Sequence, residues 1–128
     1  NGIRKALNFG HTLGHAIESY FLENEAKTKL LHGEVVAVGM ILESYISKEK
    51  GLLTNDEFHQ IKYIISNIFE PHNFTENDIE VIQNLLIHDK KNEYGKVQFA
   101  LLNGIGKIII NQSVENELIV KSFEDYKS

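Results

Sequence analysis

The stretch LNFGHTLGHAIE, residues 7–18, places two histidines four positions apart, with a glycine before each of them. Apolar side chains recur at spacings of three and four from position 11 to position 22, which predicts an amphipathic helix. His11 and His15 then project from the same face of that helix, within reach of one ion or one ligand. A pair at this spacing, taken alone, is more often two surface histidines. The neighbouring residues therefore decide how the pair is interpreted.

Two glycines and a second histidine-containing segment favour a functional site. Gly10 and Gly14 remove side chains beside the histidines, and a glycine inside a helix costs roughly 1 kcal/mol relative to alanine. Close approach by a ligand or by a neighbouring helix is the usual reason for such glycines. His32, with Gly33 and Glu34, opens a second helical segment that we expect to pack against the first. Alternatively, His32 is an N-cap residue and Glu34 is a first-turn acid favoured by the helix dipole.

The three histidines suit a metal site. Neutral imidazole nitrogens bind zinc well, and a catalytic zinc usually has three protein ligands and one open position. Two of His11, His15 and His32 would then bind the metal, and the other would contact substrate. Arg4 and Asn8 precede the pair, and an arginine side chain suits a carboxylate or a phosphate. The alternatives for these two residues are a surface ion pair and a helix cap.

The whole chain predicts a mainly α-helical domain of about five helices with one small β-hairpin. Thr54 and Thr75 precede acidic residues at a capping-box spacing. Alternating β-branched residues flank Asn103 and Gly104, which is a strong hairpin signal. The polar residues 23–29 predict an exposed loop. The expected helices span 11–22, about 33–51, 55 to before Pro71, 75 to about 88, and about 114–126, and the expected strands span about 96–102 and 107–111.

Apolar patterns also predict which faces are buried. The helix from about position 33 is apolar almost all round at first, so it should be the central, most buried helix. The last helix should turn Leu118, Ile119 and Phe123 inward. For the helix after Thr54, we expect one apolar face, made of Phe58, Ile61, Ile64, Ile65 and Ile68.

Length and composition limit the class of protein. The chain has 128 residues, enough for one domain, so we treat 1–128 as a single domain. A net charge of -5 without long runs of like charge makes nucleic acid a poor partner, and no apolar run is long enough to span a membrane. The absence of cysteine fits a reducing cytoplasm. Because the chain begins with Asn1 and its motif residues follow at once, we expect a fragment of a longer protein.

Three segments carry a resemblance to a known family. The strings R-x-x-L-N-x-G-H-T-x-G-H-A-x-E at positions 4–18 and H-G-E-x-V-x-x-G-M at positions 32–40 resemble the C-terminal half of 3-dehydroquinate synthase. D-K-K-N, followed by G-K-V-Q-F-A-L-L and I-G, at positions 89–106 resembles the next block of that family. The resemblance runs over most of the chain. It implies a helical C-terminal domain whose N-terminal partner, absent from this chain, is an α/β domain that binds NAD.

The resemblance implies an enzymatic role. In that family 3-deoxy-arabino-heptulosonate 7-phosphate becomes 3-dehydroquinate, in the second step of the shikimate route to aromatic amino acids. The implied steps are transient oxidation by NAD, phosphate elimination, reduction, ring opening and intramolecular aldol closure. His11 and His32 match the histidine ligands of zinc, or of another divalent metal such as cobalt, and the third ligand would be a glutamate of the absent half. His15 matches a catalytic position that hydrogen-bonds a substrate hydroxyl and assists proton movement.

Two residues before the histidine pair, and one of two adjacent lysines later in the chain, match substrate-contacting positions of the family. Arg4 and Asn8 would serve the carboxylate or phosphate, and one of Lys90 and Lys91 would do the same. Lysines at the end of a helix are otherwise solvated charges favoured by the helix dipole. The chain departs from the family in the segment 23–31, which looks longer than usual and affects the approach of the following histidine.

The leading interpretation is a cytoplasmic dehydroquinate synthase that acts on a small phosphorylated sugar acid and forms a homodimer or self-associates. Two other interpretations stay open. The first is another sugar phosphate cyclase of the same superfamily, acting on a different phosphorylated sugar. The second is a non-catalytic helical module that binds a metal or a partner chain, which the lack of a GxGxxG fingerprint favours. We expect the isolated chain to be inactive or nearly so.

Overall fold

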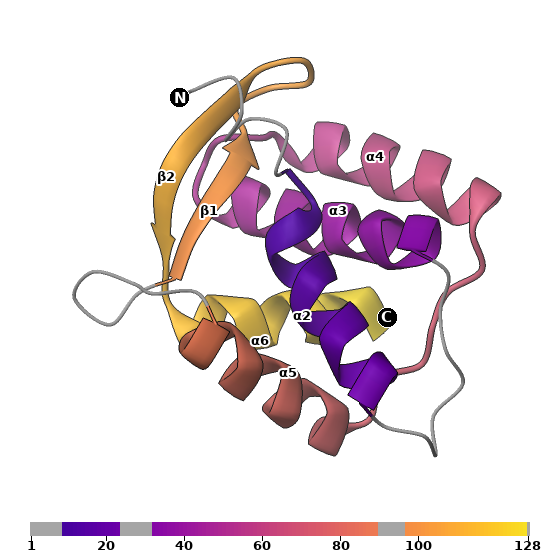
Figure 1. Ribbon diagram of the computed structural model, residues 1–128. Helices are drawn as coiled ribbons and strands as arrows, with labels where there is room; N and C mark the ends of the chain where they lie inside the picture. The colour runs from indigo at the N-terminus through magenta and orange to yellow at the C-terminus, as the bar shows by residue number, and fades with distance from the viewer. Residues whose placement is uncertain (1–8, 24–31, 90–96, 128) are drawn as a thin grey trace.

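The fold is a helical domain with a β-hairpin along one edge (Figure 1). The computed structural model describes residues 9–23, 32–89 and 97–127. These residues form five helices and two strands, which confirms the predicted class. In chain order the elements are α2 (His11–Glu23), α3 (His32–Glu49), α4 (Asn55–Ile68), α5 (Glu76–Asp89), β1 (Val97–Leu102), β2 (Ile108–Val114) and α6 (Asn116–Lys127).

Local side-chain caps set where two of the helices begin. The Thr54 hydroxyl accepts from the Glu57 amide at 3.1 Å, and the Glu57 carboxylate accepts from the Thr54 amide at 2.8 Å. Thr75 and Asp78 form the same reciprocal pair at the start of α5, at 3.1 and 2.9 Å. Each pair satisfies two backbone donors that a helix start otherwise leaves without partners. Both predicted start signals are therefore confirmed.

The hairpin pairs β1 with β2 in an antiparallel register, from Val97 opposite Val114 to Leu102 opposite Ile108. Residues 103–107 close it, with the Asn103 amide donating to the Lys107 carbonyl at 2.9 Å. The last helix was predicted to start near Val114, and that boundary is wrong. Val114 is buried and pairs with Val97, so β2 extends to it and α6 starts at Asn116.

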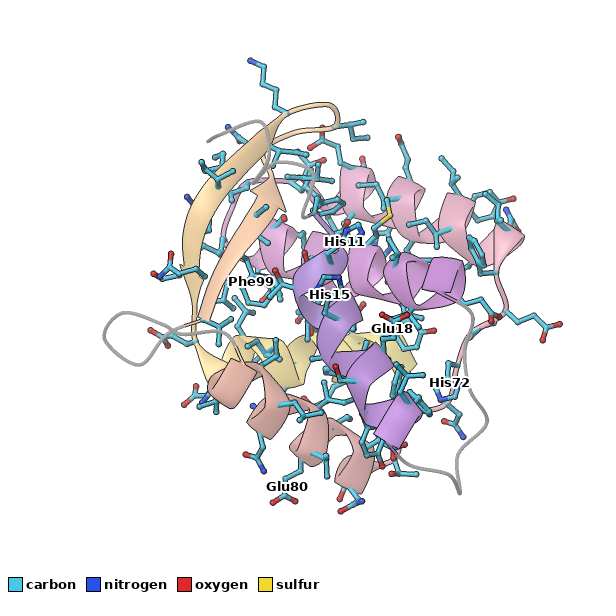
Figure 2. The ribbon with its side chains drawn as sticks, in the orientation of Figure 1. His11, His15, Glu18, His72, Glu80 and Phe99 are labelled. Carbon is cyan, nitrogen blue, oxygen red and sulfur yellow. The ribbon has the colours of Figure 1, made fainter. Side chains whose placement is uncertain are left out.

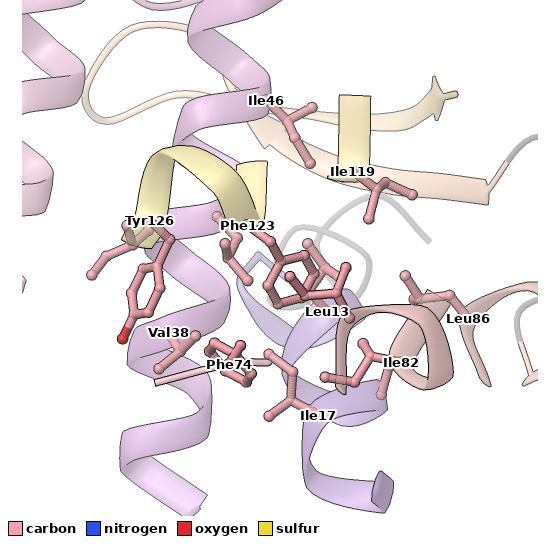
Figure 3. Close-up of a cluster of buried hydrophobic side chains, with 14 of the residues drawn as sticks. Leu13, Ile17, Val38, Ile46, Phe74, Ile82, Leu86, Ile119, Phe123 and Tyr126 are labelled. Carbon is pink, nitrogen blue, oxygen red and sulfur yellow. The ribbon is translucent and has the colours of Figure 1, made fainter. Parts of the chain in front are cut away.

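The core surrounds α3, which contacts α2, α4, α6 and β1. This confirms the prediction that the second helical segment is the central one. Phe74, in the linker before α5, lies against the rings of Phe123 and Tyr126 at centroid distances of 5.2 and 5.7 Å. Figure 3 shows these aromatics together with Leu13, Ile17, Val38, Ile46, Ile82, Leu86 and Ile119.

The buried face of α4 is narrower than its apolar pattern predicted. Phe58 is buried, but Ile64 is 58% exposed and Ile68 is 69% exposed, so their expected place on the buried face is wrong. The inward side of α4 also includes Lys62, which bonds Asp125 of α6 at 3.4 Å. Because α4 lies at the outside of α3 and not between two layers, only a thin stripe of it is covered.

Among the described helices, none has both the length and the apolarity needed to cross a membrane.

Candidate functional site

Glycines let α2 and α3 approach each other at the start of α2. A Cβ on Gly39 would lie 2.0 Å from the Gly10 carbonyl oxygen and 3.0 Å from the Gly14 nitrogen. Gly10 has φ +82, and a Cβ there would lie 2.5 Å from Cγ of Met40. Of the two reasons for glycines beside the histidines, close approach of a neighbouring helix is therefore the one that the structure gives.

A buried carboxylate from α3 caps the start of α2. Glu43 is 0% exposed, and its Oε1 accepts from the Gly10 amide at 2.8 Å while its Oε2 accepts from the Leu13 amide at 2.9 Å. Gly10 accepts the first helical hydrogen bond, from Gly14, at 3.2 Å. It therefore occupies the cap position without a capping side chain. Glu43 supplies from α3 both hydrogen bonds that a capping box takes from its own helix, and its charge suits a helix N-terminus.

His11 and His15 lie together on the outer face of α2 (Figure 2). Their ring centroids are 5.4 Å apart and their planes are at 85°. His11 is partly buried and His15 is exposed. Glu18 lies one turn further along α2 and is also partly buried (Figure 2). The predicted shared face of the two imidazoles is confirmed.

The His11 ring is oriented by the backbone. Its Nδ1 lies 3.1 Å from the Phe9 carbonyl oxygen. Because a carbonyl oxygen only accepts, this hydrogen bond requires the proton on Nδ1, and the lone pair of the ring is then on Nε2. Histidines that bind metals are commonly oriented in this way, with the second ring nitrogen donating to a carbonyl or carboxylate. The donor set at His11 therefore fits a zinc ligand.

The structure locates only part of the predicted set. Arg4, Asn8, Lys90 and Lys91 lie outside the described residues. His32 is the first residue of α3, and its side chain is outside the description, so its approach to His11 stays a prediction. Among the described side chains, which do not include that of His32, no group of three or more from His, Cys, Asp or Glu could hold a metal.

A pocket elsewhere shares no residue with the predicted set. It has a volume of about 240 Å³ and lies between α5 and α6. Its lining includes the carboxylates Glu76, Glu80 and Glu124, with Lys127, and no histidine. The histidine face of α2 is a better candidate for chemistry, because it combines imidazoles with a defined backbone orientation.

Sequence reasoning missed Glu43 and Gly39. Glu43 is a charged residue in the apolar run VVAVGMILESYI, and a carboxylate on a helix expected to be buried all round needs a partner. Gly39 lies one turn before it on the same face. That combination, a small residue and a buried acid at helical spacing, was the available signal for a helix crossing with a polar contact.

The fold places the chain among the helical domains of sugar phosphate cyclases. The structure of 2-deoxy-scyllo-inosose synthase complexed with carbaglucose-6-phosphate, NAD+ and Co2+ matches with a TM-score of 0.72 and 28% sequence identity, covering 92% of this chain and 32% of that one. The fold is also shared with 2-epi-5-epi-valiolone synthase from Streptomyces hygroscopicus subsp. jinggangensis 5008, solved with NAD+ and Zn2+ bound, at a TM-score of 0.69 and 24% identity over 94% of this chain and 32% of that one.

The sequence defines the family more narrowly. The profile described as 3-dehydroquinate synthase C-terminal matches residues 1–92, and the chain belongs to this family. The 3-dehydroquinate synthase of Parabacteroides distasonis (strain ATCC 8503) is 42% identical over 127 residues, which are 98% of this chain and 35% of that protein. The chain thus spans about a third of the length of the curated relatives that it matches.

Proposed function

We propose that this chain is the C-terminal, metal- and substrate-binding part of a 3-dehydroquinate synthase. The full protein would convert 3-deoxy-arabino-heptulosonate 7-phosphate to 3-dehydroquinate and phosphate, a carbon–oxygen lyase reaction of the shikimate route. The family membership supports the assignment. The observation that carries it is the paired imidazole face of α2, with the His11 ring oriented by the Phe9 carbonyl.

The two histidines of α2 take different roles in this proposal. His11 and His32 hold a divalent metal, with a third ligand from the remainder of the protein. When bound, the metal supplies Lewis-acid polarisation of substrate oxygens. His15, exposed and one turn further along, donates or accepts a hydrogen bond at a substrate hydroxyl and moves a proton there. The edge-to-face ring arrangement brings both imidazoles to one ligand-sized region.

Charged and amide side chains that lie outside the described residues would complete the substrate site. Arg4 and Asn8 bind the carboxylate or the phosphate, and one of Lys90 and Lys91 adds a positive charge for the same groups. Arg4 and that lysine supply the positive charge that a small phosphorylated sugar acid needs in a chain whose net charge is -5.

The cofactors and partners follow from the same assignment. NAD would be bound mainly by an N-terminal domain outside this chain, and the metal would be zinc or cobalt. In support, 2-deoxy-scyllo-inosose synthase, at 28% identity, was solved with NAD+ and Co2+. We also propose a cytoplasmic location and self-association, the latter because the apolar side chains of Tyr63, Ile64 and Ile68 are exposed on α4.

The structural likeness to 2-deoxy-scyllo-inosose synthase supports a second candidate function. Another sugar phosphate cyclase of the superfamily would use the same histidine face with a different phosphorylated sugar. The decisive experiment is an assay of the full-length protein, with NAD and zinc, on the heptulosonate phosphate and on glucose 6-phosphate. Formation of 3-dehydroquinate supports the proposal. Turnover of glucose 6-phosphate alone supports the second candidate, and metal binding without any turnover supports a non-catalytic module.

A further inference from the structure

The peptide group between Phe9 and Gly10 is hydrogen-bonded at both ends. Its carbonyl oxygen accepts from Nδ1 of His11 at 3.1 Å. Its N–H donates to Oε1 of Glu43 at 2.8 Å. A trans peptide unit is planar, with its N–H and C=O pointing in opposite directions. Whatever fixes the direction of the N–H therefore also fixes the direction of the carbonyl that orients the His11 ring.

We propose that Glu43 is a positioning residue for metal binding, acting on the His11 ring through the Phe9–Gly10 peptide. The proposal rests on the proposed function, which makes His11 a metal ligand. Glu43 is completely buried on the central helix α3, so its carboxylate is held by the core and not by solvent. The second oxygen binds the Leu13 amide at 2.9 Å, and the backbone of His11 is thereby fastened on both sides.

The charge of this carboxylate has a second effect on the ring. A negative group that accepts from a peptide N–H polarises the peptide and increases the electron density on its carbonyl oxygen. The carbonyl then accepts more strongly from Nδ1–H, and a stronger outer hydrogen bond makes the opposite ring nitrogen a better metal ligand. Glu43 thus acts on both the orientation and the basicity of His11 without touching the metal or the substrate.

The test is a Co2+ titration of the full-length protein, with the visible absorption of bound Co2+ as the readout. Glu43→Gln removes the charge and replaces one acceptor by an NH2 group, which cannot accept from a backbone N–H. We expect its Co2+ affinity to fall by about 10- to 100-fold, the range for the loss of an outer-shell partner of a metal ligand, with an altered absorption spectrum. Affinity and spectrum equal to those of the unmodified protein would overturn the proposal.

Thr54→Ala is the matched control, because it removes the capping hydrogen bond that the Thr54 hydroxyl accepts from the Glu57 amide at the start of α4, a helix that packs against α3. It should lower thermal stability and leave Co2+ affinity unchanged. If Thr54→Ala weakens Co2+ binding as much as Glu43→Gln does, general destabilisation explains the effect and the positioning role is refuted. Glu43→Asp, which keeps the charge on a shorter side chain, should bind Co2+ with intermediate affinity; an affinity below that of Glu43→Gln would contradict the charge contribution.

Two further measurements keep the outcome unambiguous. If neither Glu43 variant folds, hydrogen exchange in the unmodified protein replaces them: Co2+ should slow exchange of the Gly10 and Leu13 amides, since coupling between metal and cap is reciprocal. Unchanged exchange would refute the proposal. His11→Ala separates it from the proposed function. If His11→Ala keeps Co2+, the metal assignment itself is wrong; if only His11→Ala loses Co2+, the role of Glu43 alone is wrong.

Discussion

Gly39→Ala should destabilise the fold where α3 crosses the start of α2. The new Cβ would lie 2.0 Å from the Gly10 carbonyl oxygen and 3.0 Å from the Gly14 nitrogen, two backbone atoms that form the first hydrogen bond of α2. Neither atom can swing aside as a side chain does, so overpacking should cost about 3 kcal/mol, the upper end of its usual range. Alanine regains about 1 kcal/mol of helix propensity. The net loss in the free energy of unfolding should be about 2 kcal/mol.

Gly33→Ala is the matched control for this substitution. It makes the same chemical change in the same helix, and a Cβ at Gly33 meets nothing within 4 Å. The control should be neutral or gain up to about 1 kcal/mol. Urea unfolding followed by circular dichroism gives both free energies. Equal stabilities for the two variants would refute the close helix crossing as the reason for Gly39.

Three further predictions concern pH, metal and association. Burial raises the pKa of the Tyr126 hydroxyl, against a smaller opposing effect of the hydrogen bond from the His72 amide. The stability that this residue supports is therefore complete below about pH 10 and is lost as the pH rises. Tyr126→Phe should flatten the alkaline decline of the urea unfolding midpoint, and an unchanged decline would contradict the contribution of Tyr126. Calorimetry should show that this chain alone binds zinc more weakly than the full-length protein does. Its zinc affinity should also fall as the pH falls, because protons compete with the metal for imidazole. Zinc binding that is independent of pH and as tight as in the full-length protein would contradict the three-ligand site. Sedimentation should show self-association at high concentration that Ile64→Lys with Ile68→Lys abolishes, whereas a strictly monomeric unmodified chain would exclude it.

Features with a local cause could be predicted from the sequence. The caps at Thr54 and Thr75 depend on residues three positions apart, and both are present as expected. The shared face of His11 and His15 depends only on the helical period. The central place of α3 follows from a run that is apolar almost all round.

Features that depend on a distant partner could not be predicted in the same way. The Gly10–Glu43 hydrogen bond joins positions 33 residues apart, and periodicity says nothing about which helices cross. The apolar stripe of α4 identified a face but not how much of it a neighbour covers, so Ile64 and Ile68 were misassigned. Val114 was misassigned because strand pairing with Val97, and not its own sequence, fixes the end of β2.

The most direct test of the proposed site compares His11→Ala with His15→Ala in the full-length protein, by metal content and turnover measured on the same preparations. His11→Ala should lose both zinc and activity, because it would delete a proposed metal ligand whose Nδ1 hydrogen-bonds the Phe9 carbonyl. His15→Ala should keep zinc and slow turnover by roughly 10²- to 10⁴-fold, the range for a lost acid–base group. Loss of zinc in both variants would contradict the separate roles. Zinc and full activity retained in both would show that these histidines are not the site.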